Sequence, residues 1–483
     1  MITIQILSHD DIQSVHTATL TVLEKTGVLV RNKAALEMLL EAGCSIEERI
    51  VKLSPSLVEE CITKVPSSFE LFKRNGEKVC TVGSDRVLFN PASSAVYIKD
   101  RHTQEIRKGT SNDIIELVWL VENLEHIEAQ STALVPSDVP EQISGLYRLY
   151  LTLKNSVKPV VTGAFSKEGL IEMKSLLDVV VGGHDELKRK PRAIFDCCPT
   201  SPLTWGDTAS QNLMDCAEFS IPAAIVPAPL SGATSPITIH GTLVQANAEI
   251  LAGVVISQLK NAGTPIIYGG APGSFDMKYA TPRFGAIEAI ITSCASTEIG
   301  KYYGIPTHSY LGSSDSKSID AQSGFESGMG LLLGALSRVN VISGPGMLAH
   351  LNCQSLEKLA IDNELCGTAF RLLRGFELDE IDIITELISK VGSKGDYLRQ
   401  KHTSRRLRSE HFMPTSVIDR LNIETWISGG SKDAHQRAKQ VVSEHLENHE
   451  PIELSRDIEQ QLDNTLKEIL SKYNIPYNEL PKA

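Results

Sequence analysis

The sequence predicts an α/β protein built on a TIM (β/α)8 barrel, and two observations support this prediction. From residue 110 onward, short apolar segments of strand length alternate with longer segments of helical periodicity. With one earlier strand they make eight β-then-α units over about 290 residues, a usual size for this fold. A doubly wound open sheet is the competing topology. No GxGxxG or GxxxxGKS/T motif follows a strand, so dinucleotide or P-loop binding has little support.

The predicted strands and helices alternate strictly along the chain. We place the strands at residues 87–90, 126–129, 159–162, 193–197, 223–226, 265–268, 305–310 and 339–342. The helices carry apolar residues at a spacing of three or four, and we place them at residues 111–121, 142–154, 167–181, 208–219, 240–259, 286–302, 319–336 and 356–373. Such barrels carry their chemistry in the loops at the carboxyl ends of the strands.

Two extensions flank the predicted barrel domain, which spans residues 86–376. Residues 1–85 contain helices and a β-hairpin around Asn75-Gly76. Residues 377–483 form a charged helical extension, with long helices at 432–446 and 457–473. Its basic cluster, residues 401–412, is either a solvated helix face or a contact surface for an acidic partner or a second subunit.

Composition limits the function classes. A chain of 483 residues with 42% apolar content can bury a large core, and its net charge of −12 disfavours nucleic acid and anionic membranes as partners. A cationic ligand suits that charge better. The longest apolar runs fall short of the roughly 18 residues of a membrane span, and the N-terminus lacks a secretory pattern. Nine scattered cysteines fit reduced thiols, so we expect a cytoplasmic protein without contact to a membrane.

The stretch at residues 304–326 organises the expected site. It reads as a short strand, then a polar loop rich in Gly, Ser and Asp, then the start of an apolar helix. Asp315 and Asp320 lie in or just after this loop, where a helix N-terminus favours negative charge. Alternatively, Ser313, Ser314 and Asp315 only cap the helix.

Other chemistries find little support in the residue spacing. No CxxC, HxxxH or HExxH motif indicates a metal site, and Cys197 and Cys198 are adjacent, so they would point to opposite faces of a strand. No GxSxG elbow indicates a serine nucleophile. Only 5% of the chain is aromatic, yet several aromatic residues follow predicted strand ends: Trp205, Tyr268, Phe275, Tyr279, Phe284 and Tyr310. Aromatic faces attract quaternary ammonium, whereas core packing remains the alternative role for each ring.

Residues 310–336, with the motifs GSSDSK and DAQ, and their flanking segments 274–306 and 356–375 resemble the trimethylamine methyltransferase family. The resemblance covers nearly the whole chain. It implies a TIM-barrel enzyme that moves a methyl group from a methylated amine to the cobalt of a separate corrinoid protein. The partner, not this chain, would then carry the cobalamin. Archaeal trimethylamine members carry pyrrolysine, whereas every position here is an ordinary amino acid. Members without pyrrolysine use quaternary amines such as glycine betaine, carnitine or proline betaine.

When a quaternary ammonium gives up a methyl group, its leaving group is a neutral tertiary amine. Co(I) can therefore attack the methyl group directly, without a nucleophile from the protein. The task of the protein is mainly to position the C–N bond. Because the positive charge disappears on transfer, we expect a modest cation cage. We expect Asp315 and Tyr310 to be catalytic, and Arg283 or the loop N–H groups to meet a substrate carboxylate. The expected substrate contacts are Trp205, Tyr268, Phe275, Asp276, Tyr279, Arg283, Gly312, Ser313, Ser314 and Gln322.

The resemblance therefore predicts a glycine betaine:corrinoid methyltransferase that binds no metal of its own and works as a homo-oligomer. Three alternatives remain. The donor could be another quaternary amine or a trimethylamine-like compound. It could also be a methoxy or methylthio compound, whose leaving group usually needs zinc or an acid. Finally, the chain could be a quaternary-amine binding protein that catalyses no transfer.

Overall fold

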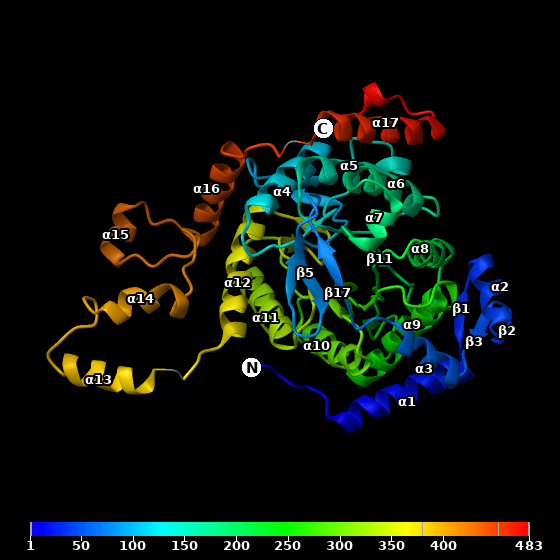
Figure 1. Ribbon diagram of the computed structural model, residues 1–483, viewed down its shortest axis with the longest axis horizontal. Coiled ribbons are helices and arrows are strands. Elements are labelled where there is room, and N and C mark those ends of the chain that lie inside the picture. The colour runs from blue at the N-terminus through cyan, green and yellow to red at the C-terminus, as the bar shows by residue number, and fades with distance from the viewer. Residues whose placement is uncertain (1, 379, 453, 482–483) are drawn as a thin grey trace.

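The computed structural model describes residues 2–481 except 379 and 453. Parallel strands lie at its centre, and helices surround them (Figure 1). The central strands are β6 (Leu88–Asn90), β9 (Gln130–Ser131), β10 (Val160–Thr162), β11 (Ala193–Cys197), β13 (Ala223–Ile225), β15 (Ile266–Tyr268), β18 (His308–Tyr310) and β19 (Val341–Ser343). The surrounding helices are α4 (Ser111–Asn123), α5 (Glu141–Asn155), α6 (Gly169–Val181), α7 (His184–Arg189), α8 (Asp207–Glu218), α9 (Ile239–Lys260), α10 (Ile287–Tyr302), α11 (Ala321–Leu336) and α12 (Leu356–Arg374).

The central strands neighbour one another in chain order. Strands β9, β10, β11, β13 and β15 form one parallel sheet, and β18, β19 and β6 form another. A parallel bridge between Tyr268 and Thr307 joins β15 to the segment before β18. At the other junction, the N–H of Glu128 donates to the carbonyl of Phe89 at 3.1 Å. Hydrogen bonds therefore connect all eight strands into a closed order.

The alternation predicted from the sequence is confirmed, with one displaced strand. Each predicted strand overlaps an observed one except that at 126–129, because β9 begins at Gln130. Regular pairing with β10 starts only there, where Gln130 lies opposite Val160. Residues 126–129 approach the sheet with buried Ile127 and Ala129, which explains their strand-like pattern.

The N-terminal segment covers one side of the molecule and fills one end of the central strands. It contains α1 (His9–Lys25), β1 (Val28–Val30), α2 (Lys33–Glu41), β2 (Ser45–Glu47), β3 (Ile50–Lys52), α3 (Pro55–Lys64), β4 (Ser68–Phe72) and β5 (Lys78–Gly83). The hairpin β4–β5 is the one predicted at Asn75-Gly76, where Gly76 has φ +89°. Its Phe69, Leu71 and Val82 pack in one cluster with strand residues such as Leu88. The hairpin therefore closes the amino ends of the strands.

Short strands in the loops add small sheets at the other end. They are β7 (Tyr97–Lys99), β8 (Ile106–Lys108), β12 (Thr204–Trp205), β14 (Leu230–Ser231), β16 (Gly273–Asp276), β17 (Thr281–Arg283), β20 (Met347–Leu348) and β21 (Cys353–Gln354). Strand β12 pairs in parallel with β1, and β21 pairs in parallel with β7. Loops that are distant in sequence are thereby fixed against each other.

The C-terminal segment is helical, as predicted. It contains α13 (Ile381–Val391), α14 (Lys401–Glu410), α15 (Ile423–Ser428), α16 (Ala434–Glu447), α17 (Arg456–Lys472) and a 3₁₀ turn (Tyr477–Glu479). Helix α16 packs on α12 and α4, and α17 packs on α6 and α5, whereas α13 to α15 project from the body (Figure 1).

Helix α9 is the one helix of the described residues that is long and apolar enough to cross a membrane. Most of its apolar window is buried inside the structure, where the helix packs against α1, α3 and α8. Helix α9 is therefore a core helix, and its hydropathy reflects burial in protein.

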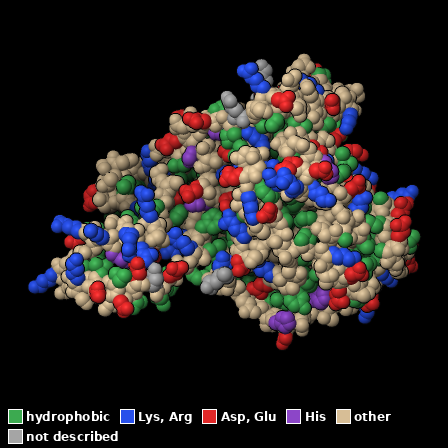
Figure 2. Space-filling view, in the orientation of Figure 1, with side chains coloured by type: hydrophobic (Ala, Val, Ile, Leu, Met, Phe, Trp, Pro, Cys, Tyr) green, Lys and Arg blue, Asp and Glu red, His purple; other side chains and the backbone are tan. Residues whose placement is uncertain are grey.

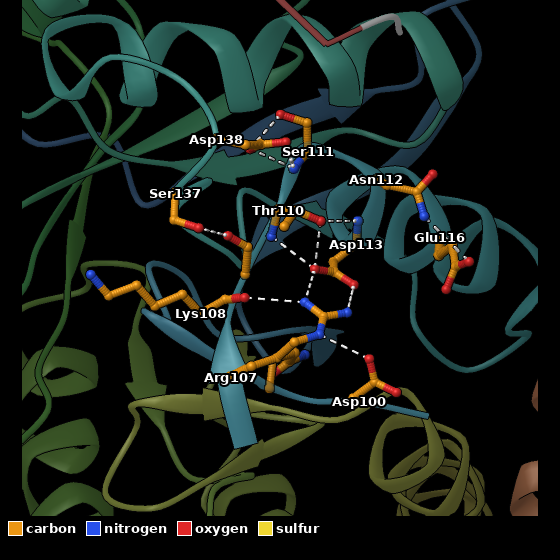
Figure 3. Close-up of polar contacts among 12 residues, drawn as sticks. Asp100, Arg107, Lys108, Thr110, Ser111, Asn112, Asp113, Glu116, Ser137 and Asp138 are labelled. Atoms are coloured by element: carbon orange, nitrogen blue, oxygen red, sulfur yellow. Dashed lines mark hydrogen bonds and ion pairs between the residues drawn. The ribbon is translucent and has the colours of Figure 1, made fainter. Parts of the chain in front are cut away.

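An ion-pair network ties the hairpin β7–β8 to the start of α4 (Figure 3). The guanidinium of Arg107 binds both carboxylate oxygens of Asp113, at 2.7 and 2.8 Å, and donates to Asp100 at 2.8 Å. Asp113 also completes a capping box with Thr110. Backbone N–H groups of Thr103 and His102, together with Arg107, hold the pKa of Asp100 well below its usual range.

Replacing Asp100 with Asn should lower the free energy of unfolding by about 1 kcal/mol at pH 7, because charge-assisted hydrogen bonds become neutral ones. The folded-state pKa is depressed, so this contribution is present above the unfolded pKa of about 3.9 and is lost as pH falls through the folded value. Urea unfolding of the parent and the variant between pH 3 and pH 7 checks this. A stability difference that grows on acidification would contradict it.

Candidate active site

A cavity of about 790 Å³ lies where the carboxyl ends of the central strands meet their loops. Residues from β11 and β18, the loops after β6 and β10, and the start of α8 line it, among them Ser93, Phe165, Asp196, Cys198, Asn212, Phe284 and Tyr310. This end is opposite to the one that the hairpin β4–β5 closes. The cavity therefore occupies the position where parallel α/β folds place their active sites.

Asp196 is the carboxylate at the floor of the cavity. The hydroxyl of Tyr310 donates to Oδ2 of Asp196 at 2.8 Å and lies 3.1 Å from the hydroxyl of Ser93. The other carboxylate oxygen of Asp196, Oδ1, has no hydrogen-bond partner among the described residues. Burial raises the pKa of Asp196 to about 7, although the hydrogen bond from Tyr310 and the charge of Arg148 oppose the rise. A group that changes charge near neutral pH thus lies in the cavity wall, and one of its carboxylate oxygens is buried without a hydrogen-bond partner among the described residues.

Arg148 supports this floor from behind. It is fully buried in α5 and donates to the hydroxyl of Ser94 at 2.9 Å, the carbonyl of Thr132 at 2.8 Å and the carbonyl of Gly163 at 2.9 Å. Its guanidinium carbon lies 4.2 Å from the ring centre of Phe165, which lines the cavity. Burial lowers the pKa of Arg148 to about 9, so the side chain is still a cation at neutral pH.

The walls are mainly apolar and aromatic. Phe165, Phe284 and Tyr310 present rings to the cavity, and Val226, Ala271 and Leu351 add aliphatic surface. Aromatic faces beside one carboxylate suit an organic cation, because both attract positive charge. Cys198 also lines the cavity, and it is the exposed member of the adjacent pair Cys197 and Cys198.

Of the residues predicted from the sequence as catalytic or substrate-binding, Tyr310 lines this cavity. Trp205 and Tyr268 instead belong to the core. The indole of Trp205 packs directly on Gly253 of α9 and donates to the carbonyl of Glu249 at 3.0 Å. Tyr268 points outward from β15, because Ile267 takes the inward position, and its hydroxyl donates to Asn247 at 3.0 Å. Strand faces therefore separate these rings from the cavity.

Phe275, Asp276, Tyr279 and Arg283 lie on or beside the hairpin β16–β17, outside the described lining of the cavity. Asp276 accepts the N–H groups of Lys278 and Tyr279 and lies 3.9 Å from Arg283. The backbone hydrogen bonds lower its pKa. Asp276 therefore acts as a turn residue, and Arg283 has an anionic neighbour in the protein itself.

Gly312, Ser313, Ser314 and Asp315 belong to the buried loop between β18 and α11, whereas Gln322 is an exposed residue in the first turn of α11. Glu326 organises this loop, since it accepts hydrogen bonds from Ser314 at 2.6 Å, from the N–H of Asp315 at 2.8 Å and from Gln322 at 2.9 Å. Lys358 donates to the carbonyl of Gly312 at 3.3 Å. The helix cap of α11 is Asp320, not the Ser313–Asp315 stretch.

Asp315 acts on the cavity through Phe284. Its two carboxylate oxygens accept the N–H groups of Phe284 at 3.1 Å and of Gly285 at 3.2 Å, and His350 lies 3.1 Å from it. Asp315 itself is buried and is not among the residues that line the cavity. The contacts make it a positioning residue for the Phe284 ring.

Replacing Asp315 with Asn should raise KM for the amine donor about tenfold, because the amide cannot accept both N–H groups and Phe284 shifts. Since the side chain does not touch the cavity, kcat should fall much less than kcat/KM. Steady-state methyl transfer at varied donor concentration checks this. Loss of kcat at unchanged KM would instead place Asp315 in the chemical step.

Sequence reasoning missed Asp196 and Arg148, although both left a signal. Asp196 is the one charged residue in the strand Ala193–Cys197, and Arg148 interrupts the apolar face of α5. A charge inside an apolar segment is costly unless it is paired or functional. Within the described residues, no group of three or more His, Cys, Asp or Glu side chains could hold a metal ion.

The fold and the cavity define an α/β protein with a candidate ligand site at the carboxyl ends of its parallel strands, and the aromatic and carboxylate lining of that site suits a small organic cation. The sequence matches the profile of the trimethylamine methyltransferase family (MTTB) over residues 1–468, so the chain belongs to this family.

Two relatives from Desulfitobacterium hafniense illustrate the range of the family. The chain is 32% identical to a glycine betaine methyltransferase over 459 residues, which cover 95% of each chain. It is 30% identical to a trimethylamine methyltransferase MttB over 470 residues, covering 97% of this chain and 94% of the relative. The crystal structure of the Methanosarcina barkeri monomethylamine methyltransferase (MtmB) shares the fold, with a TM-score of 0.50 and 14% identity, covering 92% of this chain and 94% of that one.

Proposed function

We propose that this chain is a methyltransferase that moves a methyl group from a quaternary amine to the Co(I) of a separate corrinoid protein, with glycine betaine as the leading donor. The observation that carries the proposal is the cavity itself, in which Asp196 and three aromatic rings face one space in a chain that belongs to this family. The closeness to a glycine betaine methyltransferase supports the choice of donor. Carnitine, proline betaine and trimethylamine-like donors are tested beside it.

In this proposal the protein binds and orients the donor. Methyl transfer breaks one C–N bond, the electron pair stays on nitrogen, and the methyl carbon bonds to cobalt as Co(I) becomes Co(III). The donor loses its positive charge in this step. The attraction between the carboxylate of Asp196 and the donor therefore weakens as the methyl group leaves, so the binding of the cation must stay modest for transfer to proceed.

We further propose that the eight central strands and their helices form a TIM barrel spanning residues 86–376. The closed order of hydrogen-bonded strands supports this. Residues 1–85 would form the N-terminal extension and residues 377–483 the C-terminal one. In this arrangement Tyr310 and Asp196 line the cavity at the carboxyl ends of the strands, the end from which a corrinoid protein can bring its cobalt to the donor.

The decisive experiment uses the purified chain and a cognate corrinoid protein reduced to Co(I). Adding glycine betaine should convert the Co(I) absorption spectrum to that of methyl-Co(III), and equimolar dimethylglycine should form. A panel with carnitine, proline betaine, choline and trimethylamine defines the range of donors. No spectral change with any quaternary amine would overturn the proposal, and turnover that depends on zinc would favour a methoxy or methylthio donor.

The expected homo-oligomer and cytoplasmic location remain predictions. The projecting helix α13 exposes Ile381, Ile383 and Ile388 by 57%, 51% and 53%. Figure 2 shows hydrophobic side chains together with Lys and Arg on the lobe that holds α13 to α15. We propose that a second copy of the chain packs there, and light scattering of the parent and an Ile383→Glu variant tests this.

A further inference from the structure

The cavity carries charge at two places. One is Asp196, described above. The other is its mouth, where Arg31 and Asp207 line the wall. Asp207 is already neutralised, because it pairs with Lys167 and accepts from the amide of Asn32 at 2.9 Å. Arg31 is exposed, and its guanidinium has no hydrogen bond or ion pair with any residue in the described part of the chain, so its charge is available to a ligand at the cavity wall.

The fold fixes Arg31 at this position. Arg31 follows β1 directly, and β1 pairs in parallel with β12, the strand in the loop after β11. The N–H of Arg31 donates to the carbonyl of Trp205 at 2.9 Å, which extends the pairing by one residue. The N-terminal extension therefore supplies a cation to a cavity that is otherwise built by the central strands and their loops.

The start of α8 lies beside Arg31 and adds to the positive potential. Residues 206–209 line the cavity, and Gly206, the N-cap of α8, provides no side-chain cap. The first N–H groups of a helix favour an anion, and this helix of 12 residues has a full N-terminal turn. The mouth of the cavity is thus suited to a carboxylate.

Away from Arg31, the cavity wall carries acceptor oxygens in place of positive charge. Asn212 is 5% exposed, and its Oδ1 has no partner among the described residues, although its Nδ2 donates to the carbonyl of Ala164 at 3.2 Å. Asp196 Oδ1 is also without a partner. Both residues line the cavity, and both oxygens are acceptors. This part of the cavity wall is therefore rich in acceptor oxygens, which suits a hydrogen-bond donor or a cation.

We propose that Arg31 is the residue that selects a zwitterionic donor, by binding the carboxylate of a betaine at the cavity mouth while the ammonium group lies against Asp196 and Asn212. The proposal rests on the function proposed above and deepens it. It replaces Arg283, the candidate from sequence, because Arg283 lies beside Asp276 on a hairpin outside the cavity. Choline, which has a hydroxyl in place of the carboxylate, should gain nothing from Arg31.

The test compares Arg31→Gln with Lys33→Gln in the full-length protein. Lys33 is a matched control, since it lies two residues away, its side chain is 91% exposed, and its replacement removes the same charge. Glycine betaine and choline are titrated into each protein by calorimetry, and methyl transfer from each is measured with the reduced corrinoid protein. Because Arg31 is solvent-exposed, we expect Arg31→Gln to weaken betaine binding by about tenfold, with choline unchanged and Lys33→Gln like the parent.

Two results would overturn the assignment: equal loss for betaine and choline, or betaine binding by Arg31→Gln that matches Lys33→Gln. Calorimetry also separates the two proposals. A parent that binds betaine through Arg31 but transfers no methyl group would overturn the methyltransferase function and leave the role of Arg31 intact. If the parent and Arg31→Gln transfer the methyl group of betaine equally well, the methyltransferase function stands and the role of Arg31 is overturned.

Discussion

Replacing Asp196 with Asn should lower kcat/KM for a quaternary amine by at least about 30-fold, because truncating one partner of a desolvated charge pair costs about 2–5 kcal/mol. The Asn side chain keeps the shape and the hydrogen bond from Tyr310 but loses the negative charge. In the parent, kcat/KM should rise with pH through about 7, as Asp196 ionises. The variant should show no such rise. Methyl-Co(III) formation at several pH values measures both.

The same substitution should make the protein more stable at neutral pH. The pKa of Asp196 is raised in the folded state, so folding favours the protonated form, and ionisation destabilises the fold. Stability from this group is complete below the unfolded pKa of about 3.9 and declines until pH passes about 7. The melting temperature of Asp196→Asn should therefore exceed that of the parent by a margin that widens from pH 4 to pH 7. A less stable variant would show that the carboxylate is structural.

Replacing Arg148 with Met should destabilise the fold by about 2–6 kcal/mol, because the buried carbonyls of Thr132 and Gly163 each lose a hydrogen-bond donor and each unsatisfied group costs about 1–3 kcal/mol. It should also move the pH midpoint of kcat/KM to higher pH, since the charge of Arg148 lowers the pKa of Asp196. Urea unfolding and the pH profile measure the two effects separately.

Lys358→Met is the matched control for Arg148→Met. Lys358 is also a buried cation, 1% exposed and 2.5 Å from Asp362, but it is not among the groups that shift the pKa of Asp196. This variant should be destabilised to a similar extent, with the pH midpoint unchanged. A midpoint that moves equally in both variants would mean that lost stability, rather than the Arg148 charge, alters the profile.

The order of secondary structure could be read from the sequence because burial imposes a period. Strands buried on both faces are short apolar runs, and the helices between them, such as α9, carry long apolar patterns. The displaced strand at 126–129 marks the limit of this reasoning. Ile127 and Ala129 are buried like strand residues, but the register of pairing depends on the neighbouring strand β10, which the local sequence does not encode.

The candidate cavity lies at the carboxyl ends of the strands, where the sequence predicts the site, and Tyr310 is the predicted site residue that lines it. Trp205 and Tyr268 lie in the core and not at the cavity. Successive side chains of a strand point to opposite faces, so an aromatic residue near a strand end points inward or outward according to its position in that alternation. The position of Arg31 at the cavity could not be predicted from the sequence, since the pairing of β1 with β12 joins residues more than 170 positions apart.

The hairpin β4–β5 covers the amino ends of the strands, so in the proposed reaction the donor and the cobalt-carrying protein would both reach the cavity from the carboxyl ends. The amine would then bind first, and the demethylated amine would leave only after the carrier departs. Saturating amounts of the carrier should then slow turnover, as expected for compulsory-order kinetics with a dead-end complex.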